Sequence, residues 1–73
     1  MHAAVRHVLD FFDYAHLPPH LAAVSKPFAE LAQEIAERAA TPEATVALRK
    51  LLEAKDAAVR DVVAVSKRAA PEG

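Results

Sequence analysis

The stretch AATPEA, residues 39–44, ends one helix and begins the next. Thr41 offers a hydroxyl N-cap, Pro42 suits the first helical position, and Glu43 suits the positive end of a helix. The link between the two helices is only a few residues long, and links this short join antiparallel neighbours. We therefore expect a helical hairpin that turns at this point.

Prolines and apolar spacing divide the chain, residues 1–73, into the helical segments of a single domain. We expect these segments to be a short helix over 3–13, a first long helix over 19–40, a second long helix over 42–68 and a tail over 69–73. Because Pro27 lacks an N–H group, the first long helix either bends near Val24 or begins only at 25–27. The predicted fold class is all-α: a short N-terminal helix followed by a long antiparallel helical hairpin.

A chain of 73 residues is too short to build a large core. One core of this size seldom stabilises a fold by more than about 3–5 kcal/mol, and natural domains this short add disulfides, a metal or further copies. The chain contains no cysteine, which removes disulfides and thiolate metal sites. Oligomerisation is therefore the expected source of additional stability.

The two long helices carry more apolar surface than they can cover for each other. On the first, we expect the side chains that face the hairpin core to be Leu21, Val24, Phe28, Leu31 and Ile35. Ala22, Ala29 and Ala36 form a smooth strip beside them, which either reflects helix propensity alone or receives another hairpin. On the second, apolar residues span roughly 160° of the wheel. We expect hairpins to pack on hairpins in a homo-oligomer.

The residues form no pattern that indicates catalysis or a bound cofactor. The chain has no carboxylate cluster, no glycine-rich phosphate loop, and no serine with evident histidine and aspartate partners. His16 and His20 are four residues apart, as in helical metal sites, but two prolines lie between them. We expect no enzyme activity, no cofactor and no metal.

The overall charge and hydropathy bear on partners and compartment. The net charge of −1 gives no basic footprint, so DNA and RNA are not expected partners. No run of about 18 apolar residues could span a bilayer, and Asp10 and Asp13 fall where a signal peptide would be apolar. We expect no membrane contact and a cytoplasmic location.

Charged residues of the second long helix are spaced for contacts along its surface. Two pairs of opposite charge are four residues apart: Arg49 with Glu53, and Asp56 with Arg60. Such pairs are usually solvated and stabilise a helix by about 0.3–0.5 kcal/mol. Lys55 projects into the apolar arc, so we expect its ammonium group to reach outward or to meet a carboxylate at a subunit contact, in preference to a ligand role.

Tyr14 and Lys26 suggest a ligand site. Tyr14 stands just before the stiff segment HLPP, where its ring could stack on a flat ligand and its hydroxyl could form a hydrogen bond. Lys26 falls near the alanine strip and away from Phe28, so it points towards the expected contact between hairpins. The alternative is a tyrosine that packs over the hairpin end and a solvated lysine.

Two segments together resemble a known family: FDYAHLPPHLAAVSKPFAELA, residues 12–32, and PEATVALRKLLEAKDAAVR, residues 42–60. They are similar to the phage cyclic-nucleotide sponge proteins that block CBASS signalling, which share a helical-hairpin domain with the Thoeris anti-defence sponges. The resemblance implies a homohexamer whose protomer interfaces bind cyclic dinucleotides without catalysis. It also implies that cyclic trinucleotides or cyclic ADP-ribose isomers are further possible ligands.

The resemblance assigns roles to individual residues. It matches the ligand-stacking tyrosine with Tyr14, the phosphate-binding lysine with Lys26, and a basic residue for trinucleotides with Arg60. The full set of candidate ligand-binding residues is Tyr14, His16, Lys26, Phe28, Arg49 and Arg60. We therefore predict a non-catalytic sponge that sequesters 3′,3′-cyclic GMP-AMP or a related immune signal. The alternative is a helical oligomeric adaptor or regulator that binds no small ligand.

Overall fold

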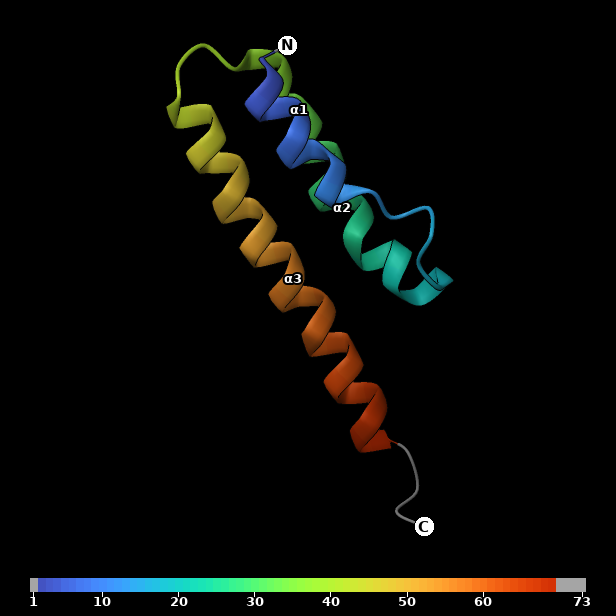
Figure 1. Cartoon of the computed structure of the whole chain (residues 1–73). Coiled ribbons are helices and arrows are strands. Elements are labelled where there is room, and N and C mark those ends of the chain that lie inside the picture. The colour runs from blue at the N-terminus through green and yellow to red at the C-terminus, as the bar shows by residue number, and fades with distance from the viewer. Residues whose placement is uncertain (1, 70–73) are drawn as a thin grey trace.

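The structure, a computed structural model, describes residues 2–69 of the chain. Its elements are α1 over Ala3–Leu9, the 3-10 helix η1 over Asp10–Phe12, α2 over Pro19–Arg38 and α3 over Glu43–Ala69 (Figure 1). The prediction of an all-helical chain is confirmed for these residues. Residues 70–73 of the expected tail lie outside the described part.

α2 is one continuous helix that contains a proline. It begins at Pro19 and continues through Pro27, so the alternative start at 25–27 is wrong. Because Pro27 has no N–H group, the carbonyl of Ala23 lacks its usual helical donor. The helix ends at Arg38, two residues before the expected end.

Polar side chains cap two of the helix starts. Thr41 Oγ1 accepts a hydrogen bond from the backbone N–H of Glu43 at 3.3 Å, as the sequence predicts for an N-cap. His2 Nδ1 accepts a hydrogen bond from the backbone N–H of Ala4 at 3.2 Å and caps α1. Pro19 lies in the first turn of α2, where its missing N–H costs no helical hydrogen bond.

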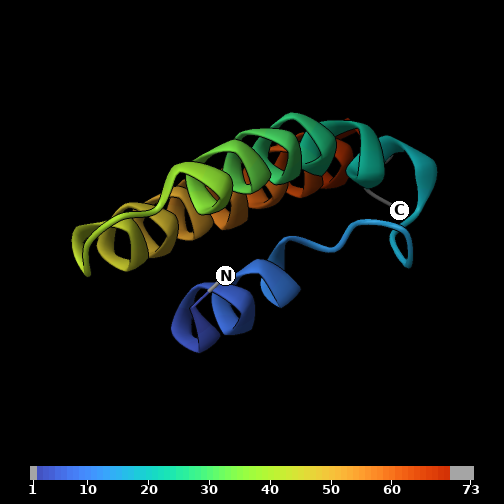
Figure 2. The same ribbon diagram turned by 90° about the horizontal axis from the view of Figure 1, so that it is seen from above.

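α2 and α3 lie side by side and run in opposite directions, joined by the connection 39–42 (Figures 1 and 2). α1 packs against both helices, along one side of the pair and at the end that carries this connection. We call this side of the pair the α1 side. The connector 13–18 then leads to the start of α2. No helix within residues 2–69 is both long enough and apolar enough to cross a membrane.

The core lies where the three helices meet. Its buried apolar side chains are Val5, Val8, Phe12, Ala32, Ala36 and Leu48. Half of these residues come from the segment of α1 and η1, which is too short to be stable alone and is held by this packing. α2 contributes alanines to the core, so its neighbours can approach it closely.

α2 turns a different face to the core from the one that the apolar stripe predicts. Ala36 is buried and Ala29 packs against the core, whereas Leu31 is 45% exposed. The prediction that Leu31 faces the core is therefore wrong, whereas Phe28 and Ile35 of the same predicted stripe do pack against the core. The strip faces the core that α1 shares, because small side chains leave room for a third helix beside α2 and α3.

α3 is longer than α2, and its last turns extend beyond the start of α2 (Figure 1). Ser66 follows Leu48 by five full turns and so lies on the same face, yet Leu48 is buried and Ser66 is exposed. Val65 is also largely exposed. Within residues 2–69, no other helix covers this end of α3.

Candidate ligand-binding site

Helical spacing shows which candidates share the α1 side. Arg49 of α3 lines a hollow together with residues of α1, so it marks the α1 side. Arg60 follows Arg49 by eleven residues, close to three turns, and therefore lies on the same side. On α2, Lys26 lies about 60° around the helix axis from Ala29, in the direction away from Phe28. This flank of α2 also belongs to the α1 side. All three cations are exposed.

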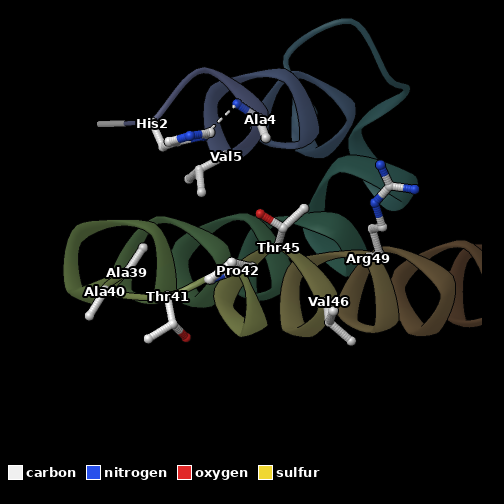
Figure 3. Close-up of a pocket in the computed structure, with 10 residues that line it drawn as sticks. All are labelled: His2, Ala4, Val5, Ala39, Ala40, Thr41, Pro42, Thr45, Val46 and Arg49. Carbon is white, nitrogen blue, oxygen red and sulfur yellow. Dashed lines mark hydrogen bonds between the residues drawn. The ribbon is translucent and has the colours of Figure 1, made fainter.

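The hollow at Arg49 has a volume of about 820 Å³ and lies between the first turn of α1, the connection 39–42 and the first turns of α3 (Figure 3). Val5 and Pro42 contribute to its apolar walls. Thr45 and Arg49 point towards α1, whereas Val46 points away from it. The volume falls within the range of about 300–1,000 Å³ that is usual for small-molecule sites.

The ion pairs along α3 differ from the predicted ones. Glu53 pairs with Lys50 at 3.5 Å, and not with Arg49. Asp56 pairs with the adjacent Lys55 at 2.9 Å, and not with Arg60. The predicted i,i+4 pairs are therefore wrong. Within residues 2–69, both arginines lack an acidic partner and their guanidinium groups can bind an anion.

Lys55 lies on the core-facing stripe of α3, and its ammonium group contacts the carboxylate of Asp56. Its side chain is only 13% exposed, and the contact with Asp56 draws the ammonium group towards the α1 side. Within the described chain, the carboxylate partner of Lys55 belongs to the same helix. The predicted set of ligand-binding residues did not include Lys55 or Asp56. Their ion pair lies between Arg49 and Arg60 along α3 and carries no net charge.

The connector 13–18 holds Tyr14 and His16. Asp13 Oδ1 accepts a hydrogen bond from the backbone N–H of Ala15 at 3.1 Å, and the N–H of Leu17 donates to the carbonyl of Tyr14 at 3.1 Å. This turn follows directly after the buried Phe12, which anchors it. Tyr14 is half-buried, so part of its side chain is accessible to a ligand.

His16 is largely exposed and lies 3.9 Å from Asp13. No group of three or more histidine, aspartate or glutamate side chains within residues 2–69 is arranged to hold a metal ion. The exposed imidazole of His16 on the connector can form hydrogen bonds.

Phe28 lies on the opposite side of the α2–α3 pair. It lines a smaller hollow of about 240 Å³ with Pro27, Leu31 and Leu51, and these four side chains are all apolar. The candidates are thus distributed over one chain: Tyr14, Lys26 and Arg60 near the start of α2, Arg49 at the other end, and Phe28 on the far side. A single chain does not bring all six together.

Comparison of the chain with protein-family models, with curated proteins and with solved structures found no match. The positions of the cations and the hollow are therefore the basis for a function.

Proposed function

We propose that the chain is a non-catalytic sponge for cyclic di- or oligonucleotide signals such as 3′,3′-cyclic GMP-AMP, as the resemblance to the phage anti-CBASS proteins implies. The observation that supports this proposal most is the position of Arg49, which has no acidic partner among the described residues and lines the large hollow. A guanidinium group binds phosphate through paired hydrogen bonds, and apolar walls suit a base.

The α1 side offers further groups for an anionic ligand. Arg60 and Lys26 are exposed there, and neither forms an ion pair within residues 2–69. Tyr14 lies on the connector that follows η1 and can stack on a purine. Stacking on an aromatic side chain contributes about 1–3 kcal/mol per base. The overall charge of −1 therefore does not prevent the α1 side from attracting a dianion.

A complete site requires more than one copy in this proposal. A cyclic dinucleotide has two phosphates and two bases, whereas one chain supplies one Tyr14 and one Lys26. A two-fold contact between copies offers each of these residues twice. The proposed assembly is a homohexamer of helical hairpins, and sequestration depletes the signal in the host cytoplasm before the host effector senses it.

The alternative is an oligomeric adaptor without a small ligand. It is supported by the exposed Leu31 and by the apolar hollow at Phe28, which lie away from the cations. Both functions involve self-association, so the oligomeric state does not distinguish them. Only the presence or absence of a bound ligand does.

Native mass spectrometry separates the two functions. The chain is incubated with 3′,3′-cyclic GMP-AMP, a cyclic trinucleotide and cyclic ADP-ribose, with the linear dinucleotide as the control for unspecific adducts. The sponge predicts a mass shift of one cyclic dinucleotide for every two chains and little shift with the linear compound. Assemblies that show no ligand mass with any of the four compounds would support the adaptor and contradict the sponge.

A further inference from the structure

An apolar surface covers the side of the α2–α3 pair that faces away from α1. Pro27, Phe28 and Leu31 of α2 and Leu51 of α3 line a hollow in it. Leu31 is the most prominent of these residues, with 45% of its surface exposed. We call this surface the Leu31 face. Exposed apolar side chains that lie together are typical of a surface that another protein covers.

The chain exposes more surface than a compact monomer of the same mass. The chain exposes 5301 Å². A compact monomer of 7.9 kDa is expected to expose about 4,400 Å². The difference of roughly 900 Å² follows in part from the elongated shape, which measures 52 × 19 × 15 Å.

The α3 edge of the Leu31 face is smooth. Ala47 and Ala54 are exposed and lie about 40–60° from Leu51 on the helix, one turn on either side of it. Leu31 and Leu51 line the same hollow, so they lie at the same level of the antiparallel pair. The face therefore combines a projecting leucine on α2 with a shallow alanine-lined seat on α3.

We propose that a second copy of the chain packs on the Leu31 face, related by a two-fold axis that runs along the α2–α3 groove. This axis places α2 of one copy over α3 of the other. It leaves each residue at the same height along the helices in both copies. Leu31 of each copy then packs between Ala47 and Ala54 of the other copy. The contact is self-complementary, as a two-fold interface must be.

The charges at the border of this face agree with a second copy. Glu34 follows Leu31 by one turn on α2, and Lys50 precedes Leu51 on α3. The two-fold axis brings Glu34 of one copy to the outer edge of α3 of the other copy, near Lys50. Opposite charges at both borders favour this pairing over one between like helices.

Two variants with matched exposure test the proposal by sedimentation velocity at micromolar concentration. The proposal predicts that the wild-type chain is assembled and that Leu31→Lys at least halves the subunit count, with an unchanged far-ultraviolet circular dichroism spectrum. Val46→Lys is the control, because Val46 is 46% exposed and lies away from this face. Its assembly should equal that of the wild type. A lone wild-type chain, or a Leu31→Lys variant with the subunit count of the wild type, would contradict the proposal.

Disulfide crosslinking tests the register, since the chain has no native cysteine. A mixture of Leu31→Cys and Ala54→Cys chains should form a covalent heterodimer under mild oxidation, whereas Val46→Cys with Ala54→Cys should not. Equal crosslinking of both mixtures would overturn the register. The inference rests on the self-association in the proposed function but not on the ligand. An assembled wild-type chain that binds no cyclic nucleotide would contradict the sponge and leave this interface standing.

Discussion

Lys55 and Asp56 are adjacent in the sequence, and their side chains form an ion pair of 2.9 Å. The pair gives the ammonium group of a largely buried lysine on the core-facing stripe of α3 a carboxylate partner. The Asp56 carboxylate, which the i,i+4 spacing alone would pair with Arg60, is thus occupied by Lys55. Arg60 is left without an acidic partner within residues 2–69, on the side of the α2–α3 pair that also carries Arg49 and Lys26.

Removal of the Asp56 charge should strengthen ligand binding. Asp56→Asn releases Lys55 and raises the net charge of the α1 side by one, so the affinity for 3′,3′-cyclic GMP-AMP should rise about threefold or more at low salt. Asp61→Asn makes the same change of charge on the other flank of α3 and should have a smaller effect. Calorimetry measures both variants, and weaker binding by Asp56→Asn would contradict a site on the α1 side.

Arg49 and Lys50 are neighbours that should differ in their effect. Arg49→Gln removes the guanidinium group of the hollow and should weaken binding at least tenfold, because a charge-assisted phosphate contact is lost. Lys50→Gln removes an equal charge that is paired with Glu53 and points elsewhere, so it should change the affinity less than twofold. Equal effects in calorimetry would mean that only the overall charge matters and that the hollow is not the site.

Replacement of Ser25 by alanine should stabilise the protein. Its side chain is 1% exposed, and its Oγ has no hydrogen-bond partner. Because a buried hydroxyl without a partner is unfavourable, Ser25→Ala should raise the free energy of unfolding by about 1 kcal/mol. The exposed Ser66→Ala is the control and should stay within about 0.5 kcal/mol of the wild type. Urea unfolding compares the three, and a marked loss of stability in Ser25→Ala would show that this hydroxyl has a partner.

Leu48 should be the side chain on which the core depends most. It is fully buried where the three helices meet, so Leu48→Ala should lower the free energy of unfolding by about 2–5 kcal/mol. Val46→Ala, two residues earlier and 46% exposed, should cost less than about 1 kcal/mol. Thermal unfolding by circular dichroism checks the difference, and similar melting temperatures would contradict the described core.

Local signals in the sequence located the helices, but the expected short helix over 3–13 was too long, because α1 ends at Leu9 and a 3-10 helix follows over Asp10–Phe12. Thr41, Pro42 and Glu43 mark the start of α3 by capping chemistry that involves only neighbouring residues, and the structure contains that cap. The face of α2 was not predictable in the same way. Its apolar stripe suggests that Leu31 is inside, but the packing of α1 decides that alanines face the core. A hydrophobic stripe alone does not tell which neighbour a helix has.

The candidate site was predictable only in its residue types. Arg49 and Arg60 stood out as cations, but their i,i+4 spacing suggested that Glu53 and Asp56 neutralise them. Two lysines form ion pairs with these acids instead. Lys50 pairs with Glu53 three residues later, and Lys55 pairs with the adjacent Asp56. The choice between such partners depends on side-chain conformation, which spacing does not fix. The hollow depends on the placement of α1, which sequence patterns on α3 do not reveal.

The proposed function is tested most directly by calorimetry of the wild-type chain with 3′,3′-cyclic GMP-AMP. The proposal predicts saturable binding near one ligand for every two chains. Tyr14→Ala and Lys26→Ala should each weaken it at least tenfold, because they remove a stacking face and a phosphate-binding cation. Absence of binding heat with the wild type, or an affinity in both variants that equals that of the wild type, would contradict the proposed function.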